Sequence, residues 1–456
     1  MDLITVIERQ RRYFHSGRTL PIPFRLEQLN RLRLSVHAHE RELLAALNAD
    51  LGKSAAEGYM TELSLVYGEI DEALRQVERW SAPRRAPLTL AAFPGRGRVS
   101  PSPYGCALIM APWNYPVQLT LNPLVAALAA GNCALVKPSA YAPATSAAVA
   151  RLIADTFTPA YVTVVEGGRQ ENTALLEQPF DVICFTGSVE VGKVVMEAAS
   201  RRLTPVILEL GGKSPAVVDR TADLKVTARR LMWGKTVNAG QTCVAPDYVL
   251  ADRRIVGDLT AEMARQSRRM WGPAPLARTD YPRIVSEKHF DRLTGLLDGQ
   301  RILHGGQYDR SSLRIEPTVL QPASLEAPVM QEEIFGPLLP VLTYDSLDQA
   351  ACFIRRRPRP LALYYFTSRQ KTARRFMEAV PFGGGCVNDT LLHLTSPHLP
   401  FGGAGDSGMG RYHGKAGFDA FTYEKSVVER GTCLDIPLRY PPYTEDKLKL
   451  LRRLFK

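Results

Sequence analysis

Cys243 is the residue of this 456-residue chain best suited to act as a nucleophile. It lies in NAGQTCVAP, a polar turn that contains glycine, whereas most of the other cysteines lie in apolar, strand-like runs. A thiol in a polar turn can form the thiolate that covalent catalysis needs, while a thiol in an apolar run is usually inert. The alternative is that Cys243 is a small buried hydrophobic residue. No GxSxG motif and no histidine motif typical of a cysteine protease provides a rival nucleophile.

Two glycine-rich segments resemble phosphate-binding loops but lack an essential part of the pattern. Gly403, Gly405 and Gly408 match GxGxxG, yet no βαβ unit with a downstream acidic residue follows them. We expect a tight loop that closes over the active site there. The segment LGGKSP, 210–215, lacks the upstream glycine of a Walker A loop. Its two glycines would allow a ligand or a second domain to approach the backbone closely.

The segment GSVEVGKV, 187–194, is the best candidate for a pyrophosphate-binding turn. It resembles a Walker A loop, but Val194 replaces the Ser or Thr hydroxyl that would bind magnesium, which disfavours an ATPase. The residues around it predict a strand (DVICF), a turn (TGS) and a helix that begins near Ser188. The free backbone N–H groups at a helix N-terminus bind anions. A plain strand-to-helix turn is the alternative.

Short strands and helices alternate around these residues. Strands are predicted at CALIMAP, CALVKPS, YVTVVEG, DVICFTG and PVILELGG, with helices from about Val117 and Ala144. This order predicts a parallel sheet with helices on both faces. The residues PWN, KPS, TGS and ELGG all fall at the carboxyl ends of these strands, where such sheets bind ligands.

The flanking regions predict a helical layer, a second α/β domain and extended elements. Apolar spacing from about Phe24 to Trp80 predicts two or three amphipathic helices, and 81–102 is an extended excursion rich in Pro, Arg and Gly. Later strands are predicted at LRIEPTVL, PLLPVLTY, LALYYFTS and GGGCVND. The last part has a candidate edge strand, KSVVERG, and a basic, Leu-rich helix over 444–455.

Composition excludes several classes of protein. The net charge is +11, but no long basic run and no groove-reading motif accompanies it, so we expect no nucleic-acid partner. The seven cysteines form no CxxC pair and the histidines form no HxxxH motif, which argues against a metal site. The cysteines are odd in number and widely spaced, which favours a reducing, cytoplasmic location. The N-terminus lacks a signal-peptide pattern, and prolines interrupt the most apolar stretch, 106–136. For the basic terminal helix we favour packing over membrane association.

Seven ordered blocks give the chain a resemblance to a known family. They are PWNYP (112–116), KPS (137–139), FTGS (185–188), LELGGKSP (208–215), WGKTVNAGQTCVAPDY (233–248), EEIFGP (332–337) and LPFGGAGDSGMGRYHGK (399–415). Over essentially its whole length the sequence resembles the aldehyde dehydrogenase superfamily, and within it the class 3 group.

The resemblance implies an α/β fold with three parts. These are a Rossmann-type cofactor domain that binds NAD or NADP, an α/β catalytic domain and a small β oligomerisation element. They would comprise 1–80 with 103–208, then 209–417, and 81–102 with 418–443, followed by a helical tail at 444–456.

The resemblance also implies catalytic roles that are chemically consistent. Cys243 would attack the aldehyde carbonyl and form a thiohemiacetal. Asn114 and the backbone N–H of Cys243 would stabilise its oxyanion. After hydride transfer, Glu209 would activate the water that hydrolyses the thioester, a role suited to a carboxyl whose pKa burial raises. Without the surrounding motifs, Glu209 and Glu333 would be interpreted as solvent-facing charges.

The implied cofactor contacts involve the ends of several strands. Glu333 would hold the nicotinamide ribose with Phe335 beside it, and Lys137 would bind the adenine-side ribose. The remaining implied contacts are Trp113 against the phosphate region and the pyrophosphate turn of Gly187, Ser188 and Gly192.

One position departs from the pattern of many family members. They carry an acidic residue directly after KPS, and this chain has Ala140. Because an acidic side chain there would repel a 2′-phosphate, its absence makes NADP admissible. We therefore expect use of both NAD and NADP.

Substrate, assembly and rival functions follow from the same resemblance. Class 3 resemblance implies medium- or long-chain aliphatic and aromatic aldehydes, with Tyr115, Trp233 and the His413 loop as candidate walls of an apolar channel. KSVVERG and the excursion after Ser81 are candidate pairing elements of a homodimer. The alternatives are a coenzyme-A-acylating aldehyde dehydrogenase, against which Glu209 argues, and a non-catalytic protein on the same fold, which should have lost its nucleophile.

Overall fold

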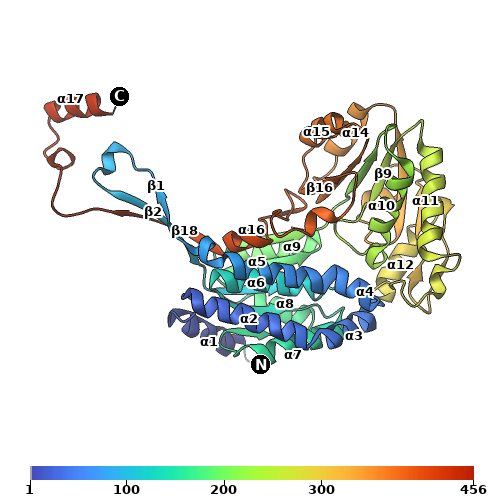
Figure 1. The fold of residues 1–456 in the computed structure, drawn as a ribbon, viewed down its shortest axis with the longest axis horizontal. Helices are drawn as coiled ribbons and strands as arrows, with labels where there is room; N and C mark the ends of the chain where they lie inside the picture. Colours follow the sequence, from blue (N-terminus) through green and yellow to red (C-terminus); the bar gives the residue numbers. More distant parts are fainter. Residues whose placement is uncertain (1–2, 456) are drawn as a thin grey trace. The chain divides into compact units, whose positions relative to one another are not determined.

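The computed structural model describes residues 3–455, which form two compact units (Figure 1). One unit comprises the chain up to Trp80 together with Pro103–Tyr423. The other comprises Ser81–Ser102 and the chain from Glu424 onward.

The larger unit begins with a layer of helices. They are α1 (Leu3–His15), α2 (Ile22–Ala38), α3 (Glu40–Leu51), α4 (Ala55–Gly58), the π-helix η1 (Tyr59–Leu63) and α5 (Ser64–Ser81). The helices expected from Phe24 to Trp80 are confirmed. Helix α1 was not expected; it buries Ile7 and Gln10, and the Gln10 amide donates to the carbonyl of Ala134 at 2.8 Å. This helix is therefore fixed by contact with the first sheet rather than by its own amphipathic pattern alone.

The first sheet has six strands, and the five expected in this region are confirmed. Its elements in chain order are β3 (Cys106–Met110), α6 (Gln118–Ala130), β4 (Cys133–Lys137), α7 (Pro143–Thr156), β5 (Val162–Val164), α8 (Arg169–Leu176), β6 (Val182–Gly187), α9 (Val189–Ser200), β7 (Val206–Leu210) and β17 (Gly408–Met409). The spatial order is β17-β7-β6-β3-β4-β5, with β17 antiparallel to β7 and all other pairs parallel.

This strand order contains the switch point at which open α/β sheets bind ligands. From β3 the chain runs outward through β4 to β5, then returns to β6 on the other side of β3 and continues to β7. The loops that follow β3 and β6 therefore diverge, and open α/β sheets bind ligands where this happens. Trp113 and Asn114 follow β3, and Ser188 follows β6. The prediction that these residues share one edge of a parallel sheet is confirmed.

The second sheet has seven strands in the order β10-β13-β14-β9-β8-β15-β16, and only β10 is antiparallel to its neighbour. Its elements are β8 (Pro215–Val218), α10 (Leu224–Thr236), η3 (Val237–Gly240), β9 (Tyr248–Asp252), α11 (Val256–Trp271), η4 (Pro275–Ala277), α12 (Glu287–Gly295), β10 (Arg301–His304), β13 (Thr318–Gln321), α13 (Pro328–Gln331), β14 (Leu338–Tyr344), α14 (Leu347–Arg355), β15 (Ala362–Phe366), α15 (Gln370–Ala379) and β16 (Gly384–Val387). The short pair β11 (Tyr308–Asp309) and β12 (Arg314–Ile315), η5 (Leu392–Leu394) and α16 (Gly414–Ala420) complete the unit.

The later strands predicted from sequence correspond to β12 with β13, and to β14, β15 and β16. Strands β8 and β9 were not predicted. They are the central strands of this sheet, with every residue buried. A run as short as PAVV is fixed as strand by its neighbours on both sides rather than by any periodicity of its own.

The smaller unit is built on a three-stranded sheet. Its elements are β1 (Arg84–Ala86), η2 (Leu90–Ala92), β2 (Arg96–Pro103), β18 (Thr422–Glu429), η6 (Pro437–Arg439) and α17 (Glu445–Leu454). Strand β2 lies in the middle, antiparallel to β1, and β18 forms one edge. The expected edge strand and terminal helix are both confirmed. Within residues 3–455 no helix has the length and apolar character needed to cross a membrane.

Asp50 caps helix α7 from outside that helix, and this makes a stability prediction. Its carboxylate accepts from the backbone N–H groups of Ala144 (3.2 Å) and Thr145 (2.7 Å) and from the Thr145 hydroxyl (2.7 Å). Asp50→Ala leaves these buried donors without a partner, so we expect the free energy of unfolding to fall by about 1–3 kcal/mol. Thermal unfolding monitored by circular dichroism measures the change.

The matched control is Asp71→Ala, which removes a partly exposed carboxylate that pairs with Arg33 at 2.7 Å. Exposed ion pairs contribute about 0–1 kcal/mol, so its midpoint should stay close to that of the wild type. Equal midpoints for the two variants would contradict the capping role of Asp50.

Candidate active site

The loop that carries Cys243 has an unusual backbone. After α10 the chain passes through Asn238 and Ala239 at φ 52° and 50°, and then through Gly240 at φ +73°. Left-handed conformations are costly for residues other than glycine and are retained where the surroundings enforce them. A Cβ atom on Gly240 would overlap the carbonyl group of Gly336. The glycine therefore lets the Cys243 loop pack directly against the segment that follows Glu333.

Gln241 anchors this loop through both ends of its side-chain amide. The amide nitrogen donates to the carbonyls of Asn238 and Arg283, each at 3.0 Å, and the amide oxygen accepts from the backbone N–H of Val285 at 3.0 Å. Because Gln241 is completely buried, these bonds replace water and fix the loop two residues before Cys243.

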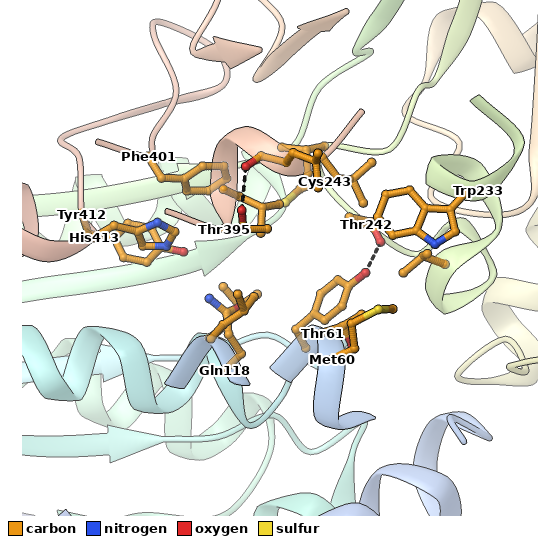
Figure 2. Close-up of a pocket in the computed structure, with 18 residues that line it drawn as sticks. Met60, Thr61, Gln118, Trp233, Thr242, Cys243, Thr395, Phe401, Tyr412 and His413 are labelled. Atoms are coloured by element: carbon orange, nitrogen blue, oxygen red, sulfur yellow. Dashed lines mark hydrogen bonds between the residues drawn. The ribbon is translucent and has the colours of Figure 1, made fainter. Parts of the chain in front are cut away.

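Cys243 lies in the wall of a cavity of about 200 Å³. Figure 2 shows it opposite Gln118, with Tyr412 and His413 at one end and Trp233 at the other. Most of the other lining residues are apolar: Met60, Leu65, Leu119, Val237, Val244, Leu391, Leu392, Leu394 and Phe401. Tyr115, Trp233 and His413, which sequence analysis suggested as channel walls, all line this cavity.

Asn114 is tied to the same loop from the first sheet. Its side-chain nitrogen donates to the carbonyl of Gln241 at 3.0 Å, and the next residue, Tyr115, bonds through its hydroxyl to that of Thr242 at 2.6 Å. An amide nitrogen carries two N–H groups, so one remains for a ligand. The structure thus brings Asn114 beside the Cys243 loop.

Glu209 is a buried carboxyl group at the end of β7. It is 2% exposed, and neither of its oxygens has a hydrogen-bond partner among residues 3–455. Burial, and then the nearby Glu333 carboxyl, raise the pKa of Glu209 well above its ordinary value. Burial followed by the two carboxyls also raises the pKa of the Cys243 thiol. Glu209 is therefore not a solvent-facing charge, and it lies close enough to Cys243 to affect its ionisation.

Glu333 lies against the glycines that link the two sheets. A Cβ on Gly211 would overlap its carboxyl group, and its Oε1 atom is buried without a hydrogen-bond partner in the described chain. Burial and then Asp247 raise the pKa of Glu333 to about 8. This unpaired acceptor in a glycine-lined recess is suited to a ligand hydroxyl.

The loop that bears Glu333 is clamped by an ion pair that the sequence analysis missed. Lys213 donates to Asp247 at 2.5 Å, and also to the carbonyls of Val329 (2.9 Å) and Glu332 (2.7 Å). Asp247 in turn accepts from the backbone N–H of Ile334 at 2.9 Å. Both charged residues lie within the quoted blocks LELGGKSP and WGKTVNAGQTCVAPDY, but no spacing rule pairs them.

Aromatic side chains extend the site from the Glu333 loop to the end of β4. The rings of Trp113 and Phe335 meet edge to face at 5.3 Å, and Phe335 has a left-handed backbone with φ 50°. His289, also absent from the sequence analysis, lies 5.2 Å from the Trp113 ring and 6.1 Å from that of Tyr141. These rings form an apolar wall beside the first sheet's crevice.

The predicted phosphate turn has the geometry expected of it. Ser188 is the N-cap of α9 and accepts from the backbone N–H of Val191 at 3.4 Å, and Gly187 ends β6. Gly192 packs against Leu210, and a Cβ there would overlap the methyl groups of that leucine. At the end of β4, the Lys137 ammonium donates to the carbonyls of Pro138 (2.7 Å) and Gly167 (2.6 Å).

The GxGxxG segment occupies a different place. Gly405 bridges to Gly408, and Gly408 in β17 pairs with Glu209 of β7. A Cβ on Gly403 would overlap the carbonyl of Ser407, so glycine there permits a tight turn. As expected, this segment forms a tight loop next to Glu209 rather than a turn that opens a helix.

Comparison with known proteins places this chain in a family. The family model described as "Aldehyde dehydrogenase family" matches residues 1–427. The chain is 45% identical over 446 residues to 4,4'-diaponeurosporen-aldehyde dehydrogenase of Staphylococcus aureus, which covers 97% of each chain. It is 45% identical over 454 residues to aldehyde dehydrogenase family 3 member H1 of Arabidopsis thaliana, with 98% of this chain and 94% of the relative covered.

A solved structure agrees with these sequence matches. The fold superimposes on a substrate-bound state of Staphylococcus aureus AldH with a TM-score of 0.97, at 44% identity and with all of both chains covered. The resemblance to class 3 aldehyde dehydrogenases, and the expected α/β fold, are confirmed. The chain therefore belongs to the aldehyde dehydrogenase family and is an NAD(P)-dependent enzyme that oxidises aldehydes.

Proposed function

We propose that Cys243 is the nucleophile of this oxidation. The observation that carries the proposal is the position of Cys243: it lies in the wall of an apolar cavity, in the loop to which the Asn114 amide bonds, and near enough to the unpaired Glu209 carboxyl for that group to raise the pKa of the thiol. The other cysteines do not line this cavity. Burial and then two carboxyls raise the pKa of the thiol, and the attacking thiolate forms when the thiol loses its proton to solvent water.

The thiolate attacks the aldehyde carbonyl to form a thiohemiacetal. Its oxyanion is stabilised by the free amide N–H of Asn114 and the backbone N–H of Cys243. The hydrogen bond from Asn114 to Gln241 supports this role, since it fixes the amide plane before substrate arrives. A donor held in place in a site closed to water stabilises developing charge without reorganising.

The residues at the sheet edge fit a nicotinamide cofactor. The unpaired Glu333 oxygen beside Gly211 would accept from ribose hydroxyls, with Phe335 next to it. Gly187, Ser188 and Gly192 at the start of α9 would receive the pyrophosphate, Trp113 would lie against the phosphate region, and Lys137 would bind the adenine-side ribose. Bound NAD⁺ or NADP⁺ supplies the hydride acceptor that converts the thiohemiacetal into a thioester.

Glu209 then acts as the base for hydrolysis of the thioester. Its unpaired oxygens can hold a water molecule and accept its proton as the water attacks the acyl carbon. A raised pKa makes the carboxylate a stronger base than an exposed glutamate. The carboxylic acid leaves and Cys243 is regenerated.

Neither alternative function is favoured. A coenzyme-A-acylating enzyme would transfer the acyl group instead of hydrolysing it, and the buried Glu209 beside Cys243 supports hydrolysis. A non-catalytic protein on this fold would not need to retain Cys243, Glu209 and Asn114 together. Assays with and without coenzyme A separate the first alternative, because only an acylating enzyme would depend on it.

The substrate class follows from the cavity. Its lining is mostly aliphatic and aromatic, so we propose aldehydes with medium or long aliphatic chains or aromatic groups. The name of the staphylococcal relative refers to a diaponeurosporen-aldehyde, which supports an apolar substrate.

We also propose which segments of the chain bind the cofactor, which carry out catalysis, and how the chain assembles. The first sheet, within 1–80 and 103–208, would bind the cofactor, and 209–417 would be catalytic. Residues 81–102 and 418–443 would form the oligomerisation element of a homodimer, since β18 has a free edge among the described strands. The seven cysteines are all free, which supports the cytoplasm as the location.

Replacing the nucleophile gives the first test. Cys243→Ala should lower kcat for aldehyde oxidation by about four orders of magnitude or more, because no other group can form the thiohemiacetal. The measurement follows reduced cofactor over a panel of aliphatic and aromatic aldehydes. Cys386→Ala, which changes another partly exposed thiol, should retain the wild-type rate. Equal rates of cofactor reduction by Cys243→Ala and wild type would make the mechanism wrong.

Replacing the base separates the two halves of the reaction. Glu209→Gln should keep a burst of about one reduced cofactor per site and then turn over about 10²–10⁴-fold more slowly, because hydrolysis loses its base. The wild-type rate should rise with pH over a range above the ordinary glutamate value of about 4.3, since the raised pKa keeps the carboxyl protonated to higher pH. Stopped-flow absorbance measures both phases. An unchanged steady-state rate, or loss of the burst itself, is inconsistent with this role.

The exposed side chain at position 140 tests cofactor choice. Wild type should use both NAD and NADP, and Ala140→Glu should lower kcat/KM for NADP by at least about tenfold, because its carboxylate repels the 2′-phosphate. Ala140→Gln, of similar shape but neutral, should keep most of the NADP activity. Steady-state kinetics with both cofactors decide the matter. A preference of wild type for NAD above about a hundredfold, roughly 2.7 kcal/mol, would contradict the prediction.

A further inference from the structure

Lys53 and Glu62 form a completely buried ion pair behind the cavity. The ammonium and carboxylate lie 2.6 Å apart, and both side chains are 0% exposed. Neither residue lines the cavity. Removing two charges from water costs several kcal/mol for each ion, and the cost is offset only when further hydrogen bonds satisfy the remaining donors and acceptors. The partners of this pair therefore indicate what it does.

The π-helix η1 turns Glu62 away from the cavity. Met60 and Thr61 of this helix line the cavity, whereas the next residue, Glu62, reaches the start of α6. Its Oε2 atom accepts from the backbone N–H groups of Val117 (2.8 Å) and Gln118 (3.2 Å). Single π turns within helices recur at functional sites. Glu62 thus caps α6 from a neighbouring helix and places a negative charge at its N-terminus.

Lys53 connects the same pair to Asn114. Besides Glu62, its ammonium donates to the carbonyl of Asn114 at 3.0 Å and lies 4.0 Å from the centre of the Tyr115 ring. Glu62 therefore fixes the backbone on the C-terminal side of Asn114, and Lys53 fixes Asn114 itself. Together they hold the segment 114–118 at both ends.

The Cys243 loop closes this arrangement from the other side. Asn238 donates through its side-chain nitrogen to the carbonyl of Asn114 at 2.7 Å and to that of Gln241 at 3.1 Å. The Asn114 amide itself donates to Gln241. Any shift of the Asn114 backbone would consequently change the direction of its free amide N–H relative to Cys243.

We propose that Lys53 and Glu62 are positioning residues for aldehyde oxidation, which hold Asn114 so that its free amide N–H points at the oxyanion formed on Cys243. This inference rests on the proposed role of Asn114 as an oxyanion donor. Neither side chain of the pair lines the substrate cavity, and its contacts with the cavity wall, to Tyr115 and Gln118, lie within the segment 114–118 that it holds.

Two variants test the pair, with a matched control. Lys53→Met removes the cation and leaves Glu62 buried without its partner. Lys53→Met/Glu62→Gln removes both charges and keeps similar shapes, which avoids a lone buried charge. The control, Arg33→Met/Asp71→Asn, makes the same kind of change at a partly exposed pair in the same helical layer. All are measured in the full chain.

The readouts distinguish positioning from a general structural role. We expect both test variants to lower kcat about tenfold to a hundredfold, as weakening one oxyanion donor does, with KM changed by less than about threefold. Alkylation of Cys243 by iodoacetamide develops no oxyanion, so its rate should stay within about twofold of wild type. When Asn114 has already been replaced by alanine, the Lys53 and Glu62 substitutions should cause almost no further loss of kcat, because the amide that the ion pair positions is absent. The control should match wild type throughout.

Several results would overturn the inference. One is a wild-type kcat in both variants. Another is an alkylation rate that falls in proportion to kcat. A third is a loss of kcat in the Asn114→Ala background as large as the loss in the wild-type background. Failure of both variants to fold would also overturn it, because the pair would then serve the fold itself. If instead Asn114→Ala alone retains the wild-type rate, the proposed oxyanion role of Asn114 is wrong, and the proposed function fails separately from this inference.

Discussion

The carbonyl oxygen of Asn114 joins three parts of the chain that are far apart in sequence. It accepts from Lys53 of the helical layer and from Asn238 of the loop that leads to Cys243, while Asn114 itself follows the first strand of the first sheet. A carbonyl oxygen has two lone pairs, and both are used here. Since the oxygen is buried, neither bond can be exchanged for water without cost. Together with the bonds from the Asn114 amide to Gln241 and between the Tyr115 and Thr242 hydroxyls, this acceptor fixes the position of Asn114 relative to the Cys243 loop.

The charges around Cys243 form a second constraint. The carboxyls of Glu209 and Glu333 raise the pKa of the thiol, and Glu333 raises the pKa of Glu209. Each ionised carboxylate in the site therefore disfavours ionisation of its neighbours. Lys235 opposes this effect. It is 1% exposed with no hydrogen-bond partner in the part of the chain that the structure describes, and burial lowers its pKa to about 8. Its charge favours the ionised form of Glu333. A buried lysine of this kind compensates for carboxylates that must be close together.

Much of the first sheet and of the site could be predicted from sequence because the signals are local. Strands such as CALIM and DVICF are apolar runs bounded by turn residues, and the turn at Ser188 follows from a strand, a glycine and a helix in order. The contacts that hold the site together were not predictable. Lys53 and Glu62, or Lys213 and Asp247, pair through the fold alone, and a charged residue in a helix is usually interpreted as solvent-facing. Family resemblance pointed to the residues proposed to react, while the contacts that support them required the structure.

The short link between the two sheets explains why Glu209, in the first sheet, and Glu333, in the loop before β14 of the second, are close enough for Glu333 to raise the pKa of Glu209. Only residues 211–214 separate β7 from β8, and nearly all of them are bonded or packed on the second sheet's side. Gly211 packs against Glu333, Lys213 bonds to Asp247, and the Ser214 hydroxyl accepts from the backbone N–H of Ala362 at 3.1 Å. Glu209 is the penultimate residue of β7, two residues before this link. A movement of one sheet against the other would therefore have to break the contacts that place Glu333, so the distance between Glu209 and Glu333 is fixed by the same segment that joins the two sheets.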